Sequence, residues 1–180
     1  MNNQTATKKL TRLAMLVAIS LVLLTIVHIP FPPAPFLEYD PADVPIFIGA
    51  FAYGPLAGLA LTVIASVIQG VTVSSSSSII GIIMHIFATG AYVLVAGTIY
   101  KKNTTKKGAV CSLVAGTLVM TAVMVLCNLI FTPIFMGQPM KDVVAMLLPI
   151  IIPFNLLKAG VNSLITFFLY KPLEKFLSIK

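Results

Sequence analysis

The sequence predicts an all-α integral membrane protein, and two observations carry that prediction. Hydrophobic residues make up 58% of the 180 residues and charged residues only 9%, against roughly 45–50% and ~25% in soluble globular proteins. The 12 basic and 5 acidic side chains cannot cover a compact body that faces water. The second observation is a series of long apolar runs that only lipid accommodates. Soluble enzymes are therefore excluded, and residues 1–180 are expected to form a single membrane domain.

Hydropathy separates five apolar segments that can each span a ~30 Å hydrocarbon core: 10–29, 45–70, 79–100, 109–131 and 143–170. Five crossings would place the lysines at 101–102 and 106–107 opposite the basic N-terminal segment, against the positive-inside bias. Breaking the second segment at Gly54-Pro55 removes this conflict. The expected bundle then has six transmembrane helices, at roughly 9–29, 44–54, 55–70, 79–100, 107–131 and 143–172.

The second of these helices is unusually short. Ten residues from Val44 to Tyr53 rise only ~15 Å, so this helix cannot cross lipid unaided and its neighbours must shelter it. With six crossings, both termini lie on the inner side together with most of the basic residues, which accounts for the net charge of +7. Because the basic residues lie between apolar runs and not along one stripe, no nucleic-acid partner is expected.

The first outer loop, residues 28–43, is expected to form a lid over a site. It holds five prolines, three acids and the aromatic side chains Phe31, Phe36 and Tyr39, a composition that suits a semi-rigid covering segment. A plain connector stiffened by proline is the alternative. The second outer loop contains the serine run 74–78, which is expected to be only a connector.

The strongest polar signal lies in the last apolar segment. Asn155, Lys158, Ala159 and Asn162 recur at i, i+3, i+4 and i+7, so they share one helix face. A lysine inside a span costs ~2.5–3.5 kcal/mol on insertion scales and normally faces a cavity or a partner; snorkelling to the interface is the alternative. Asn128, near the outer end of the preceding helix, can meet this stripe, unless its amide only holds two helices together.

These groups suit a flat, largely neutral ligand rich in heteroatoms and held between apolar walls. Amides both donate and accept, whereas an ammonium only donates. A fused ring with carbonyls and an imide N–H would be matched by Asn155 and Asn128, with Lys158 donating to a ring acceptor. The acidic lid would suit a polyol tail. Gln69, near the outer end of the third helix, either meets a ligand or caps its loop.

Other kinds of chemistry find little support. No GxxxxGK[ST] phosphate loop is present. His28 and His85 lack ligand-spaced partners, so no metal site is expected, and His85 is interpreted as a helix-packing or hydrogen-bonding residue. No Ser-His-acid set is expected to converge, and all five acids are placed outside the apolar cores. We therefore expect neither catalytic residues nor a bound cofactor.

The first helix carries Ala14 and Ala18 on one face. Small residues four apart allow close helix approach in lipid. Because alanine pairs are common, this spacing alone is weak evidence for a docking face.

At these positions the sequence resembles the S components of energy-coupling factor transporters, the membrane substrate-binding subunits of vitamin transporters. The resemblance rests on the AxxxA helix, on residues 36–45 (FLEYDPADVP) and on residues 49–55 (GAFAYGP). Within that family, Asn128 with residues 131–133 (FTP), and residues 153–158 (PFNLLK), are similar to the riboflavin-specific members. The resemblance covers nearly the whole chain.

The resemblance implies a six-helix protein in the bacterial plasma membrane, with both termini cytoplasmic, that binds riboflavin as transported substrate. It implies that Asn128, Asn155 and Lys158 contact the isoalloxazine ring and that four lid residues close over it: Leu37, Glu38, Tyr39 and Asp40. It further implies that Ala14 and Ala18 dock on a transmembrane coupling subunit that carries two ATPase subunits. An S component for a pterin or pantothenate and a stand-alone proton-coupled carrier remain alternatives; the carrier would need a carboxylate deep in the bundle.

Overall fold

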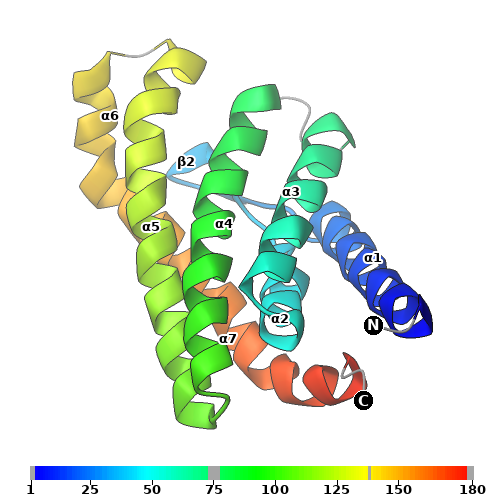
Figure 1. The fold of residues 1–180 in the computed structure, drawn as a ribbon. Helices are drawn as coiled ribbons and strands as arrows, with labels where there is room; N and C mark the ends of the chain where they lie inside the picture. Colours follow the sequence, from blue (N-terminus) through cyan, green and yellow to red (C-terminus); the bar gives the residue numbers. More distant parts are fainter. Residues whose placement is uncertain (1–2, 73–77, 138, 178–180) are drawn as a thin grey trace.

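The computed structural model describes residues 3–72, 78–137 and 139–177, and within them the chain is almost entirely helical (Figure 1). The elements follow in this order: α1 (Asn3–Ile26), β1 (Ile29–Phe31), β2 (Ala34–Tyr39), α2 (Asp43–Tyr53), α3 (Pro55–Thr72), α4 (Ser78–Lys102), α5 (Lys106–Met136), α6 (Met140–Met146), a π-helical turn (Leu147–Ile151) and α7 (Ile152–Leu177).

Among the described residues, five helical stretches are long and apolar enough to cross a membrane: Ala6–Ile26, Pro55–Thr72, Ile79–Lys102, Lys106–Ile134 and Met140–Leu173. The chain is therefore a multi-pass membrane protein. The expected count of six crossings depends on α2, which is too short to be counted by length, so that count stays a prediction.

Helix α2 is enclosed by the rest of the bundle. Residues 43–51 are all buried, and the helix packs against α1, α3, α4 and α7. Two stacked aromatic pairs hold α2 against α4. The ring centroids of Phe47 and Tyr92 lie 3.6 Å apart, and those of Phe51 and Tyr100 lie 4.1 Å apart. Protein therefore shelters the short helix, as its length requires.

The break between α2 and α3 falls at the predicted Gly54-Pro55 dipeptide. Gly54 has φ of +91°, a conformation that side chains rarely adopt, and Pro55 starts α3, where its missing N–H is harmless. Gly58 then lets the two helices approach closely, since a Cβ added there would lie 2.6 Å from the Ala50 Cβ.

This close approach gives a stability prediction. A Gly58→Ala substitution is expected to destabilise the protein by about 1–3 kcal/mol, because the new methyl group overpacks the contact with Ala50. Gly160→Ala is the matched control, since nothing lies within 4 Å of its added Cβ. Thermal unfolding in detergent measures both variants. Equal unfolding temperatures for the two would contradict the close packing of α2 on α3.

The first loop departs from the expected all-α fold. It forms an antiparallel hairpin of β1 and β2, in which Ile29 pairs with Tyr39 and Phe31 with Ala34. These strands were not predicted from the sequence, because the prolines interrupt the alternation of apolar and polar residues by which strands are recognised. With only two strands, the hairpin keeps its prolines at edge positions, where a missing N–H is tolerated.

Several helix boundaries also differ from the prediction. Helix α1 begins at Asn3 and not near residue 9. The polar residues that precede its apolar run are also helical. Helix α5 continues past Pro133 and ends at Met136, and Gly137, whose φ is +62°, caps its C-terminus. The last predicted helix is divided by the π-helical turn, in which Pro149 lies. Proline removes a backbone donor and so favours this local widening.

Candidate functional site

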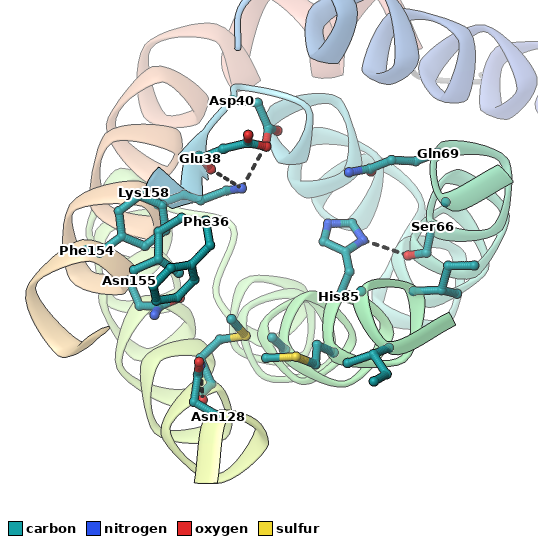
Figure 2. Close-up of a pocket in the computed structure, with 18 of the residues that line it drawn as sticks. Phe36, Glu38, Asp40, Ser66, Gln69, His85, Asn128, Phe154, Asn155 and Lys158 are labelled. Atoms are coloured by element: carbon teal, nitrogen blue, oxygen red, sulfur yellow. Dashed lines mark hydrogen bonds and ion pairs between the residues drawn. The ribbon is translucent and has the colours of Figure 1, made fainter. Parts of the chain in front are cut away.

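A cavity of about 210 Å³ lies beneath the hairpin, somewhat smaller than the ~300–1,000 Å³ typical of small-molecule sites. Figure 2 shows it enclosed by side chains from several elements. Its lining comes from α1, β2, α3, α4, α5 and α7: Leu24, Phe36, Leu37, Glu38, Asp40, Ser66, Gln69, Gly70, Ile80, Gly81, Ile82, Met84, His85, Ala88, Met120, Met124, Asn128, Thr132, Phe154, Asn155 and Lys158.

Three polar residues expected to form the site line this cavity together. Asn155 and Lys158 come from α7 and Asn128 comes from α5. Asn155 donates to the Ile151 carbonyl at 2.8 Å, and Asn128 donates to the Met124 carbonyl at 2.8 Å. An amide has two N–H donors, so each asparagine retains hydrogen-bonding capacity for a ligand.

Lys158 turns toward the hairpin. Its ammonium donates to Asp40 Oδ2 at 2.8 Å and to the Glu38 carbonyl at 3.2 Å, and its side chain is 17% exposed. Because an ammonium has three donors, one remains beyond these two contacts. Lys158 therefore fastens the end of β2 to α7 in addition to lining the cavity, a role that the sequence did not predict.

Hydrogen bonds between the end of β2 and Asn162 of α7 also hold this strand to the bundle. The Tyr39 hydroxyl donates to Asn162 Oδ1 at 3.1 Å, and Asn162 Nδ2 donates to the Asp40 carbonyl at 3.1 Å. Burial, and then the neighbouring Asp40 carboxylate, raise the pKa of the Tyr39 hydroxyl, so it stays a donor at neutral pH. Neither residue lines the cavity. The structure thus separates Tyr39 from the other three lid residues.

The remaining lid residues line the cavity in different ways. Leu37 is buried in a small cluster with Ala34 and Phe154, which seats the hairpin on α7. The Glu38 carboxylate pairs with His28, and Asp40 holds Lys158. The Glu38–His28 pair lies within the hairpin segment, so the hairpin is joined to the bundle by the apolar packing of Leu37 and by the Asp40–Lys158 ion pair.

A buried polar network, which the sequence did not predict, borders the far side of the cavity. His85 Nε2 lies 2.9 Å from Asp43 Oδ1, and His85 Nδ1 lies 2.6 Å from Ser66 Oγ. Thr89 also donates to Asp43 Oδ1, at 3.1 Å. The Asp43 side chain is 1% exposed, so the placement of all five acids outside the apolar cores was wrong. Figure 2 shows the His85–Ser66 contact.

The hydrogen bonds of this network engage both ring nitrogens of His85. Ser66 Oγ also donates to the Thr62 carbonyl at 2.6 Å, so its hydroxyl is bound to both the ring and the backbone of α3. His85 thus bridges the Ser66 hydroxyl and the Asp43 side chain. Asp43 Oδ2 is buried and has no hydrogen-bond partner within the described chain.

Ser66, His85 and Asp43 thus converge, although no such set was expected. Their arrangement does not suit nucleophilic catalysis, because the Ser66 hydroxyl is engaged with the backbone of its own helix. Ser66 also lies inside α3, where helix hydrogen bonds occupy the N–H groups that an oxyanion hole would need. The network is better explained as a way to keep a charged pair inside the bundle.

Ala14 and Ala18 lie away from the cavity. Both are exposed on α1, which lies at one side of the bundle (Figure 1). A face open to lipid is compatible with the docking surface that the sequence suggested.

The comparisons with known proteins decide the family. The profile described as "ECF transporter, substrate-specific component" matches residues 8–170. The chain is an ECF transporter substrate-specific component. Among its relatives, the riboflavin transporter FmnP of Bacillus subtilis (strain 168) is 31% identical over 88% of this chain and 87% of its own length. The riboflavin transporter RibU of Staphylococcus aureus (strain TCH60) is 30% identical over 97% of this chain and 95% of its own length.

A solved structure agrees with the family. A chain whose structure is described as "Structure and mechanism of the S component of a bacterial ECF transporter" superposes with a TM-score of 0.79 at 30% identity. The match covers 97% of this substrate-specific component and 99% of that chain. Family and relatives are transporter components and not enzymes.

Proposed function

We propose that this substrate-specific component is a high-affinity riboflavin-binding subunit that mediates riboflavin uptake together with an ATP-driven energy-coupling module. The supporting observation is the cavity in which Asn128, Asn155 and Lys158 meet beneath the hairpin. Relatives named riboflavin transporters, each about as long as this chain, point to the same vitamin.

The cavity chemistry suits the ring of riboflavin. Its carbonyls and imide N–H need donors and acceptors close together, which two carboxamides provide. The remaining Lys158 donor faces a ring acceptor, and Phe154 and Phe36 supply flat apolar walls. Leu37, Glu38 and Asp40 close the site, while Tyr39 holds the hairpin from outside the cavity.

The orientation follows from the same proposal. The hairpin faces the outside of a bacterial plasma membrane, where the vitamin is captured, and both termini face the cytoplasm. Ala14 and Ala18 contact a transmembrane coupling subunit, which carries two ATPase subunits. Riboflavin is the transported substrate and not a cofactor, and its binding to this chain is expected to involve no metal ion.

Riboflavin titration of the purified protein tests the proposal. Asn155→Ala is expected to weaken binding about 10-fold, because the loss of one buried hydrogen bond corresponds to ~1–1.5 kcal/mol. Asn103→Ala is the matched control, since Asn103 is an exposed amide between α4 and α5. Quenching of flavin fluorescence in detergent measures both. Unchanged affinity in Asn155→Ala would remove this residue from the site, and wild-type protein that fails to bind riboflavin would refute the proposed function.

Two other functions remain to be separated from this one. A substrate-specific component for a pterin or pantothenate would share the fold, and the absence of yellow colour in protein purified from riboflavin-fed cells would favour it.

A stand-alone proton-coupled carrier is favoured by the buried Asp43–His85 pair. Uptake in vesicles that lack the ATPase subunits, driven by a pH gradient alone, would identify such a carrier.

A further inference from the structure

The cavity has a second polar wall, opposite the amide-lined wall. Ser66 and Gln69 from α3 and His85 from α4 contribute to it. In Figure 2, Gln69 and His85 face Lys158 and Phe36 across the open space. Three methionines also line the cavity: Met84, Met120 and Met124.

Gln69 is the free hydrogen-bonding group of this wall. Within the described part of the chain it has no hydrogen-bond partner, although its side chain lines the cavity. Ser66 and His85 cannot take its place, because Ser66 is bound to Thr62 and His85 is held at both ring nitrogens. An amide with two free donors and a free acceptor is therefore available to a ligand on this side.

The charge of this wall indicates which ligand groups it prefers. His85 is paired with the Asp43 side chain, so it offers the cavity no unpaired charge. A neutral amide that donates and accepts matches hydroxyl groups, which also do both. A phosphate would find no free cation on this wall, because both ring nitrogens of His85 are engaged.

The hairpin carboxylates are less suited to binding the hydroxyl groups of a ligand than the sequence suggested. The acidic lid was expected to hold a polyol tail, but the Glu38 carboxylate pairs with His28 and the Asp40 carboxylate pairs with Lys158. Each pairing engages one oxygen of its carboxylate, so these groups can still accept from a hydroxyl group, but an ionised carboxylate donates no hydrogen bond. The α3 wall retains an uncommitted group.

We propose that Gln69 is a specificity-determining residue that binds the hydroxyl groups of the ribityl chain. This inference rests on the proposed riboflavin function. The ring lies against Asn128, Asn155 and Lys158, and the chain extends past the methionines to the α3 wall. Gln69 therefore distinguishes riboflavin from flavins that lack the hydroxylated chain.

The test compares riboflavin with lumiflavin, which has the same ring and a methyl group in place of the chain. Gln69→Leu keeps the side-chain size and removes the amide. Riboflavin affinity is expected to fall about 10-fold, since a lost pair of hydrogen bonds corresponds to ~1.4 kcal/mol or more. Lumiflavin affinity is expected to change less than about twofold. Asn155→Ala, the comparison variant, weakens both ligands, and Thr72→Val is a control outside the cavity on the same helix.

The outcomes separate the two proposals. If wild-type protein binds neither flavin, the riboflavin function itself fails. If wild-type protein binds riboflavin and Gln69→Leu binds it equally well, the ring site stands and the assignment of Gln69 is overturned. Equal weakening of riboflavin and lumiflavin in Gln69→Leu also overturns it, because that result places Gln69 against the ring or in a structural role.

Discussion

Riboflavin affinity is expected to fall about 10- to 100-fold when Lys158 is replaced by methionine, because a hydrogen bond from a charged group corresponds to ~1.5–3 kcal/mol. The same change leaves the Asp40 carboxylate, whose side chain is 9% exposed, without its cation. Breaking a buried pair from one side destabilises by about 3–5 kcal/mol, so the unfolding temperature should fall as well. Fluorescence quenching measures the affinity, and thermal unfolding in detergent measures the stability.

A double variant separates the two roles of Lys158. Asp40→Asn combined with Lys158→Met removes both charges, and the new amide can still accept from the Ala42 N–H, as Asp40 Oδ1 does at 3.0 Å. Stability is expected to recover in large part, because no buried charge is left alone, while riboflavin affinity stays low. Full recovery of affinity would show that Lys158 only anchors the hairpin.

The largest loss of stability is expected for His85→Leu. This change leaves the Asp43 carboxylate with only the Thr89 hydroxyl as partner, inside a bundle where the Asp43 side chain is 1% exposed. A buried carboxylate without its cation costs about 3–5 kcal/mol, enough to lower the unfolding temperature markedly or to prevent folding. Thermal unfolding at neutral pH in detergent measures the effect.

Adding Asp43→Asn to His85→Leu provides the control. The double variant buries no charge, and the new amide can accept from Thr89, so most of the lost stability should return. If His85→Leu alone unfolded at the wild-type temperature, Asp43 would not be a buried carboxylate that depends on His85.

The helical part of the fold was largely predictable from local sequence. Apolar length identified the five long helices, and Gly54-Pro55 marked the break before α3 because both residues constrain the backbone directly. The stripe on α7 was visible because helix periodicity places Asn155, Lys158 and Asn162 on one face. The structure brings two of these residues into the cavity and uses Asn162 to hold β2.

The contacts that sequence reasoning missed join residues far apart in the chain. Asp43 and His85 are 42 positions apart, and Asp43 follows a loop, so local reasoning placed it in water. The packing of α2 among α1, α3, α4 and α7 buries it. The hydrogen bond between the Tyr39 hydroxyl and Asn162 likewise joins residues 123 positions apart, so local sequence could not reveal it. A contact between Tyr39 and the ligand stays a prediction.

The structure of the protein with riboflavin bound, by crystallography or electron cryomicroscopy, tests the central claim most directly. We expect the isoalloxazine ring beneath the hairpin, within hydrogen-bonding distance of Asn128, Asn155 and Lys158. A vitamin bound at another surface, with the cavity filled by side chains of the surrounding helices, would contradict it.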